Sequence, residues 1–374
     1  YSTPWPLSEQ YYLCVYDGQA NAQYGPIATE KRRYSIVLLD VFGNRVEVFT
    51  HPEISCLNPM PLRPRQRPPI LAHGTLVGRP ALADGTRPVP IPKEQLPKTA
   101  KIGLINVYNT RRPFPQGTKI KALRIWQVLP KTTPLADVPR IGYGDQKGAK
   151  IVLGTVPVEA DGSAYWEQPV NVPILFHALD ENGAAVQGMR SVTYVAPGET
   201  LMCNGCHDQR VGSQPPVGTP VAMKRPASII TPETVDGTNP FHFARLIQPI
   251  LDAKCVACHT EHRKAGGKNI PPDLSRGNYT QDKNRFYASF VSLKPYVKFY
   301  NSASFTESYT VPGNFGAYGS KLYQMLKKGH HDVQLAPDEW RRLAIWMDSN
   351  GLFHGHDVDI DAQAEGKVVP IPMY

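Results

Sequence analysis

The sequence predicts a mixed fold, in which a β-rich, antiparallel, sandwich-like domain over residues 1–225 precedes a mainly α-helical domain over residues 226–374. Short apolar segments separated by turn residues recur through the first 200 residues. From about residue 225 the apolar spacing becomes helical. Proline accounts for 37 of 374 residues, roughly twice the usual ~5%, which disfavours long helices.

The strands are predicted from short apolar runs that end at turn residues. Residues 34–39 and 46–49 flank the turn 40–44 and predict a hairpin. The run 174–179 leads to Asn182-Gly183, a strong turn signal. Further strands are expected at 103–109, 120–129, 151–158 and 190–195. Regular spacing of such strands favours an antiparallel sandwich or barrel.

Three helices are predicted in the C-terminal part. Asn239-Pro240 is typical of a helix start, and an apolar stripe follows over 243–251. A second helix is expected over 320–328, ending at Gly329, and a third over 337–350, ending at Gly351. Residues 263–318 show little pattern.

The charge balance and hydropathy exclude some classes of protein. Forty-one Lys and Arg against 32 Asp and Glu give a net charge of +9, but the basic residues are scattered and accompany no nucleic-acid-reading motif. No apolar run approaches the roughly 18 residues that a membrane helix needs. We therefore expect neither a nucleic-acid partner nor a membrane span.

Four of the six cysteines form two C-x-x-C pairs, and a histidine follows each pair directly. The two motifs are Cys203-Asn204-Gly205-Cys206-His207 and Cys255-Val256-Ala257-Cys258-His259. This is the attachment signature of c-type haem. Two thiols reach the two vinyl groups of one porphyrin, while the adjacent imidazole ligates the iron. The sequence therefore predicts two covalently bound haem c groups, and its helical part predicts a cytochrome c-like domain around the second.

Other readings of the C-x-x-C pairs explain less. A zinc ribbon needs two pairs some 15 to 20 residues apart, whereas 48 residues separate Cys206 from Cys255. Zinc also gives no reason for both trailing histidines. A thioredoxin-like redox pair would use one C-x-x-C in a βαβ setting, which neither motif has.

Covalent haem attachment occurs outside the cytoplasm in bacteria, so we expect a periplasmic or extracellular protein. The sequence starts at Tyr1 with neither an initiator Met nor a signal segment, so a cleaved signal peptide or further upstream chain is expected. An oxidising compartment favours a disulfide between Cys14 and Cys56. The alternative is two buried free thiols.

Several segments resemble the hydrazine synthase alpha-subunit-like proteins. They are residues 122–130, 152–158, 178–183, the run through the first haem motif, the strap 59–69, and the segment 328–331 with Trp346 and Asn350. The resemblance implies a β-rich middle domain with one haem, followed by a cytochrome c-like domain with a six-coordinate haem. A β-propeller commonly precedes the middle domain in that family, so a relative without it is expected. Hydrazine-forming members hold the first iron through a tyrosine soon after the motif, with zinc nearby, whereas residues 208–212 include no tyrosine.

Motif logic makes His207 and His259 the proximal iron ligands. For the second haem, His330 and His331 follow the helix stop at Gly329, and the resemblance favours His330. Met325 on the preceding helix is the rival, and it would raise the reduction potential.

The distal ligand of the first haem stays open at the sequence level. His177, in an apolar strand, is one candidate, although such a residue is more often a satisfied core histidine. His73, His242, His262 and Met189 are others, and an open distal site is the competing outcome. His354 and His356 are expected at the surface.

Function follows from iron coordination. Two six-coordinate irons predict a protein that transfers electrons, within a larger redox complex and with other cytochromes or redox subunits as partners. This is the leading prediction. An open first haem instead predicts a haem enzyme acting on a small nitrogen or oxygen compound. No residue pattern for a third chemistry is present.

Overall fold

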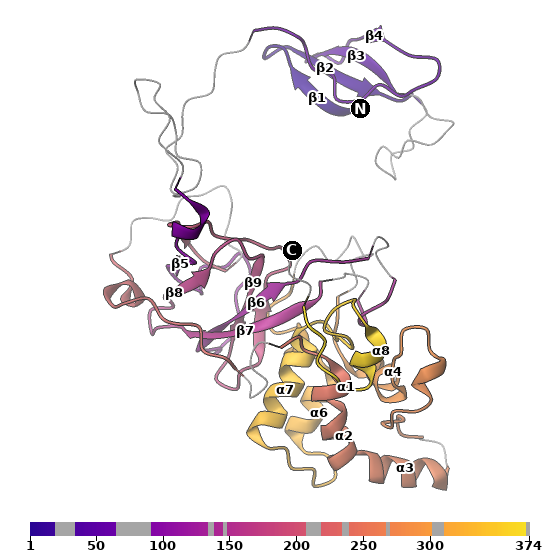
Figure 1. Ribbon diagram of the computed structural model, residues 1–374. Helices are drawn as coiled ribbons and strands as arrows, with labels where there is room; N and C mark the ends of the chain where they lie inside the picture. The colour runs from indigo at the N-terminus through magenta and orange to yellow at the C-terminus, as the bar shows by residue number, and fades with distance from the viewer. Residues whose placement is uncertain are drawn as a thin grey trace. The chain divides into compact units, whose positions relative to one another are not determined.

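The computed structural model describes residues 1–18, 34–64, 91–133, 138–144, 148–206, 218–233, 239–266, 270–300 and 310–371. The chain divides into two compact units, residues 1–70 and 71–374 (Figure 1). The expected boundary at 225/226 lies inside the second unit. Strands occupy the N-terminal half and helices the C-terminal part, so the predicted mixed fold is confirmed at this level.

The first unit is one antiparallel sheet. Its strands β1 (Ser2–Pro6), β2 (Tyr11–Tyr16), β3 (Ser35–Asp40) and β4 (Arg45–Phe49) pair in chain order. The predicted hairpin at 40–44 is confirmed. The Asp40 carboxylate accepts the backbone N–H groups of Phe42 and Asn44, and Gly43 takes the positive φ of 88° that closes the turn.

The expected disulfide between Cys14 and Cys56 is absent, and both thiols are free. Cys14 lies opposite Val37 on β3, whereas Cys56 donates its backbone N–H to the Tyr34 carbonyl. Three residues along a strand span about 10 Å, beyond the reach of a disulfide. Burial raises the pKa of the Cys14 thiol.

The second unit contains two sheets. One has the order β10-β9-β6-β7 and the other β11-β5-β8. The strands are β5 (Thr99–Leu104), β6 (Ala122–Val128), β7 (Lys150–Pro157), β8 (Ala164–Pro169), β9 (Ile174–Leu179), β10 (Ala185–Gly188) and β11 (Thr200–Cys203). Short 3-10 turns lie at Lys93–Gln95, Val221–Lys224, Tyr279–Gln281 and Lys294–Tyr296.

Three strand predictions differ from this arrangement. The strand expected at 103–109 overlaps β5 only at residues 103–104. β11 pairs parallel with β5, so the sandwich is not wholly antiparallel. The expected strand at 190–195 is reduced to a bridge between Thr193 and Ile174.

The two sheets of the second unit enclose one hydrophobic core. Alternate side chains of β9 point into this core and away from it. Ile174 and Ala178 belong to the core between the sheets, whereas Leu175 contacts the core of the helices. Odd and even positions of a strand face opposite sides. β9 therefore separates the sandwich core from the helical core.

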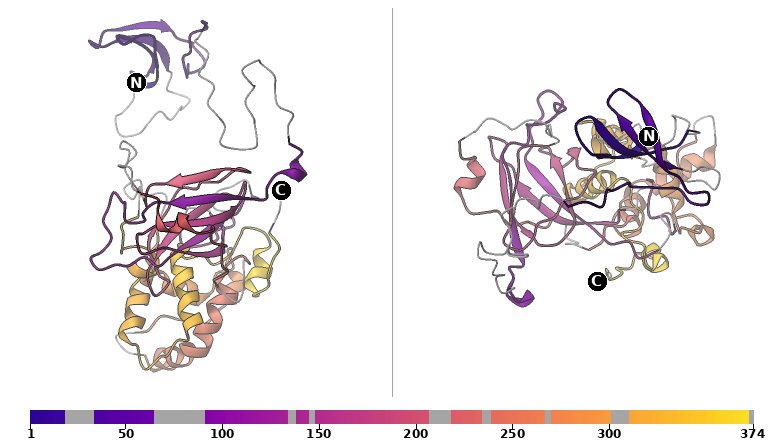
Figure 2. Two further views of the ribbon diagram at one scale, coloured as in Figure 1. Left: turned by 90° about the vertical axis from the view of Figure 1, so that its left-hand side faces the viewer. Right: turned by 90° about the horizontal axis from the view of Figure 1, so that it is seen from above.

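The helices gather on one side of the sheets (Figures 1 and 2). They are α1 (Phe243–Leu246), α2 (Gln248–Lys254), α3 (Val256–Ala265), α4 (Ala288–Leu293), α5 (Gly316–Gly319), α6 (Lys321–Lys328), α7 (Pro337–Asp348) and α8 (Ile360–Ala364). The three predicted helical regions are confirmed, the first of them divided into α1, α2 and α3. Phe243, Phe290, Trp346 and Phe353 form the centre of the helical core, each at most 1% exposed.

A buried ion cluster joins the sheet to the helices. The Arg124 guanidinium on β6 donates to Glu233 and, at 2.7 Å, to Asp348 at the end of α7. Asp348 also accepts the backbone N–H groups of Ala185 and Ala317. Helices and sheets of the second unit thus share a fixed contact.

Within the described ranges, no helix is both long and apolar enough to cross a membrane.

Candidate functional site: a cavity at the second C-x-x-C-H motif

A cavity of about 460 Å³ lies among α2, α3 and α6. Cys255, Cys258 and His259 lie along one side of it, and His330 is also part of its wall. The other lining residues are mostly apolar, among them Ile250, Leu251, Leu274, Leu293, Tyr296, Leu322, Met325, Leu326, Val333, Leu335 and Leu343. A largely apolar cavity of this size suits a cofactor with a few ligating groups.

The chain places the two thiols and the imidazole within little more than one helical turn. Cys255 lies between α2 and α3 and donates its N–H to the Leu251 carbonyl, and His259 donates its own to Cys255. No residue of α3 is buried by protein atoms, although α3 forms one side of the cavity. A helix of 10 residues has little stability alone, so α3 needs a partner on its cavity side.

The His259 ring is oriented by a backbone carbonyl. Its Nδ1 lies 2.9 Å from the Pro272 oxygen, and a carbonyl accepts only from a protonated nitrogen. That bond leaves Nε2 as the nitrogen with a free lone pair. A second partner of this kind is what fixes the tautomer and direction of metal-ligating histidines.

His330 faces His259 at a separation that suits one shared metal ion. The two ring centroids are 6.3 Å apart. A metal ion at about 2 Å from one nitrogen of each ring separates the centroids by roughly 6 Å. Partial burial, with His331 and His259 adding to it, lowers the pKa of His330. A neutral imidazole is the form that can ligate iron.

The rival ligands lie in the same cavity wall. Met325 on α6 and His331 both line it. The His331 ring lies 4.6 Å from the His330 ring. Only His330 has its ring at ligand-pair distance from His259 among the described contacts.

Burial favours the protonated form of the Cys255 thiol. Burial raises the pKa of the Cys255 thiol to about 11, with Glu339 and Cys258 adding to the effect. A protonated thiol is a poor nucleophile. Within the described ranges, no group of three or more His, Cys, Asp or Glu side chains could hold a metal ion.

The first motif begins at the end of β11. Cys203 is the last residue of that strand, and Cys203 and Cys206 pack against the sandwich core. The backbone N–H of Ile105 donates to Cys203, and that of Asn106 to Asn204. A side chain at Gly205 would collide with the backbone oxygen of Asn109, so this position requires glycine. His207 lies outside the described residues.

The structure does not bring His177 to the first motif. His177 is 3% exposed, and its ring contacts Trp126, which donates an Nε1–H to its Nδ1 at 3.1 Å, and Phe315. His177 lies on the face of β9 that points away from the sandwich core. Cys203 and Cys206 pack against that core, on the opposite face of the strand. Burial, with Arg124 and Lys150 nearby, lowers the pKa of His177 well below its usual value. The residue is a neutral core histidine.

The other candidate ligands are dispersed. Met189 packs against the helical core, His262 lines the cavity, and His73 lies outside the described residues. His242, His354 and His356 are at most 2% exposed. The expectation that His354 and His356 lie at the surface is therefore wrong. His354 donates to the Asn284 carbonyl and His356 to Val369, contacts that a local sequence pattern does not reveal.

Sequence reasoning missed the cavity residues contributed by 270–300. Pro272 orients His259, while Leu274, Leu293 and Tyr296 line the cavity. The Pro271-Pro272 pair shortly after the motif is the one local signal, because such a pair forms an extended segment whose carbonyls lack helical partners.

Comparisons with known proteins agree with the motif pattern. The family model for the hydrazine synthase alpha subunit middle domain matches residues 118–208. Hydrazine synthase subunit alpha of Kuenenia stuttgartiensis is 26% identical over an alignment that covers 42% of this chain and 27% of that protein. The solved structure of Kuenenia stuttgartiensis hydrazine synthase superposes with a TM-score of 0.63 at 18% identity, covering 94% of this chain and 55% of that chain. That structural likeness concerns the fold alone.

The chain spans about half or less of the length of these relatives. The matched middle-domain segment includes the whole first C-x-x-C-H motif, and the structural match extends over the part with the second. The chain is therefore similar to the hydrazine synthase alpha-subunit-like proteins, the family that its sequence motifs resemble.

Proposed function

We propose that the chain carries two covalent haem c groups and is a redox protein of the exported compartment. The observation that carries the proposal is the cavity with Cys255 and Cys258 on one side and the His259 and His330 rings 6.3 Å apart. In this proposal, His259 and His330 ligate one iron. Cys203, Cys206 and His207 hold the other group through the first motif.

The cytochrome c-like character of the helical part is a component of this proposal. Bound haem supplies one-electron redox chemistry at iron. The protein residues attach it, exclude water and fix its ligands. The apolar wall from Leu251, Leu293, Leu322 and Leu343 excludes water, and the Pro272 carbonyl holds His259 in one tautomer. His259 and His330 would hold the iron at the second site.

We place substrate chemistry at the first site. The proposed reaction class is redox conversion of a small nitrogen or oxygen compound, with electrons passing through the second site. Support comes from the match of residues 118–208 to the hydrazine synthase alpha middle domain, because this match ends directly after the first motif. The same relationship favours an enzyme over the simple electron carrier that the sequence alone favoured. A carrier is the second candidate, supported by the histidine pair that would close the second iron to substrates.

The proposed setting follows from the same chemistry. Covalent haem attachment places the chain in the periplasm or outside the cell. The curated relative is named as a subunit, alpha, of hydrazine synthase. We propose a hetero-oligomer with other cytochromes or redox subunits as partners.

Carbon monoxide distinguishes an open iron from a closed one. The reduced protein is treated with carbon monoxide, and the fraction of haem whose Soret band shifts is measured. The enzyme proposal predicts a shift of about half the haem, since only the first iron is open. The absence of any shift would favour the carrier.

Two variants test the ligand assignment. His330→Ala opens the second iron, so the shifting fraction rises toward all the haem. His331→Ala, a neighbouring histidine of the same cavity wall, leaves the fraction unchanged. The reverse pattern would assign the ligand to His331.

A further inference from the structure

We propose that the rim of the cavity is the docking surface for an acidic redox protein. This inference rests on the proposed function, because it assigns the partner that exchanges electrons with the haem at this cavity. It concerns the exposed residues around the cavity, which the ligand assignment does not use.

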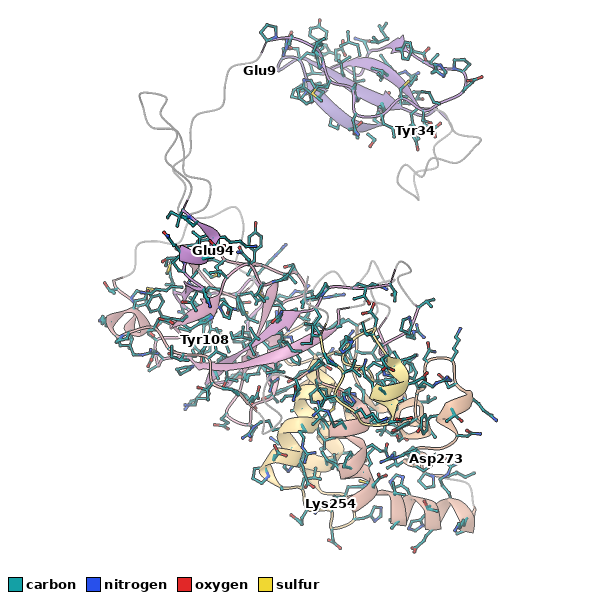
Figure 3. The ribbon with its side chains drawn as sticks, in the orientation of Figure 1. Glu9, Tyr34, Glu94, Tyr108, Lys254 and Asp273 are labelled. Atoms are coloured by element: carbon teal, nitrogen blue, oxygen red, sulfur yellow. The ribbon has the colours of Figure 1, made fainter. Side chains whose placement is uncertain are left out.

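Apart from the two thiols and Tyr296, the titratable side chains in the cavity wall are all basic. These side chains are Lys254, His259, His262, His330 and His331. None of the described lining residues is a carboxylate. Lys254 lies at the junction of α2 and α3, at the edge of the helical part (Figure 3). Because the proposed ligands His259 and His330 are neutral, Lys254 supplies the positive charge in the cavity wall, beside the exposed Cys258.

Three helices that line the cavity end in basic residues. α2 ends at Lys254, α3 in His262-Arg263-Lys264, and α6 in Lys327-Lys328. All of these side chains are exposed. Arg263, Lys264, Lys327 and Lys328 do not line the cavity. Arg263 donates to the Pro271 carbonyl and Lys327 lies over the Tyr323 ring, but all four side chains are exposed to a partner.

Carboxylates of the same segments offset only part of this charge. Asp252 and Asp338 form ion pairs with Arg276 and Arg342. Glu339 accepts the backbone N–H of Ala336, and Asp273 that of Ser275. Glu261 and Asp332 are the remaining exposed acids. Six exposed basic residues, Lys254, Arg263, Lys264, Lys321, Lys327 and Lys328, lie on α2, α3 and α6.

An apolar opening surrounded by exposed cations suits a partner whose own redox centre is surrounded by carboxylates. Complementary charge raises the rate of encounter and fixes orientation more than it raises affinity. Steering of this kind raises association rates by a factor of about 10 to 1,000 and weakens with salt. The partner proposed is accordingly a small acidic redox protein that binds transiently.

Redox probes of opposite charge test the local electrostatic potential at the rim of the cavity. The reduced protein is mixed with hexacyanoferrate(III), an anion, or hexaammineruthenium(III), a cation, and haem oxidation is followed by stopped flow. Each ferrous haem loses one electron and each probe ion gains one. The variant is Lys254→Gln with Lys327→Gln and Lys328→Gln. The matched control is Lys93→Gln with Lys98→Gln and Lys121→Gln, three exposed lysines of the sheet region.

The proposal predicts that the rim variant slows oxidation by the anion by a factor of about three to ten at low salt. It accelerates oxidation by the cation, and the sheet variant changes neither rate. The effect shrinks as ionic strength rises from about 0.01 to 0.1 M, where the Debye length falls from about 30 to 10 Å. Equal rates in the rim and sheet variants would overturn the docking surface.

A binding measurement provides a readout independent of turnover. Flavodoxin, an acidic flavoprotein, is titrated into each haem-loaded variant in a calorimeter at low salt. Weaker binding to the rim variant alone supports the docking surface, and unchanged binding contradicts it. Haem content is measured on the same samples. A protein without haem would refute the proposed function, whereas a haem-loaded protein that is insensitive to rim charge would refute only the docking surface.

Discussion

Arg124 is the residue that most directly couples the sheet to the helices. Its side chain is fully buried and donates to Glu233, Asp348 and the Gly183 carbonyl. A buried cation with two carboxylates is tolerated because every charge has a partner. Removing one partner leaves the others unpaired in a low-dielectric environment.

We expect Arg124→Met to lower the free energy of unfolding by about 3–5 kcal/mol. Glu233 and Asp348 would lose the guanidinium that compensates their buried carboxylates. Urea denaturation at pH 7 measures the loss.

Arg225→Met is the matched control, because Arg225 pairs with Glu159 at 2.7 Å while about a third of its side chain stays exposed. An exposed pair of this kind contributes about 1 kcal/mol or less. Equal losses in the two variants would contradict the assigned role of Arg124.

His354 makes the stability depend on pH. Burial lowers its pKa to about 4, whereas an unfolded histidine titrates near 6.5. The unfolded state therefore binds the proton first. The stability from neutral His354 is complete above about pH 6.5 and is lost progressively as the pH falls toward 4. The difference corresponds to about 3 kcal/mol.

We expect His354→Gln to flatten this dependence, because an amide can still donate to the Asn284 carbonyl but does not titrate. Urea midpoints at pH 7 and pH 4.5 are compared for both proteins. Carboxylates contribute equally to the two curves, so the comparison isolates His354. Parallel curves would show that His354 does not titrate on unfolding.

At the scale of elements, α3 depends on what fills the cavity. It spans 10 residues, none of them buried, and its thiol and imidazole groups line the cavity. In the proposed function, covalent attachment of a cofactor would supply most of the contacts that hold this helix.

We expect Cys255→Ser with Cys258→Ser to remove amide-exchange protection from α3 while α7 stays protected. The helix would lose its cavity-side contacts, whereas α7 is buried in the helical core. Hydrogen exchange followed by mass spectrometry measures both. The corresponding control is Cys203→Ser with Cys206→Ser, which leaves α3 protected. Unchanged protection of α3 in the first variant would refute the dependence.

Local sequence patterns predicted helices well where single residues also mark the start and the end of the helix. α6 starts after Ser320 and ends before Gly329, and α7 starts at Pro337, so both bounds were readable from single residues. The run 190–195 failed as a strand because its backbone has one bridge partner, at Ile174, rather than a neighbouring strand. The parallel pairing of β11 with β5 joins residues about 100 positions apart, which no local signal specifies.

The part of the candidate site that could be predicted is the part in which covalent haem attachment would fix the spacing of the residues. Cys255, Cys258 and His259 were identified from the motif, and His330 from a family resemblance. Pro272 was missed because its role depends on one backbone carbonyl. The burial of His354 and His356 was missed because their contacts, Asn284 and Val369, are distant in sequence or lie in extended chain.

At the scale of the whole molecule, the second unit holds both motifs in one body. The first motif lies at the end of β11 against the sandwich core, and the second lies among the helices on the other side of β9. The Arg124 cluster fixes one side to the other. Two redox centres in this arrangement would keep a constant separation.

The central claim is that four thiols carry two porphyrins. Mass spectrometry of the denatured polypeptide, purified from a host that attaches haem c, measures this directly, because thioether bonds survive unfolding. The account predicts an increment of about 1.2 kDa over the sequence mass, falling by about half when Cys255 and Cys258 are both replaced by Ser. A polypeptide of unmodified mass would contradict it.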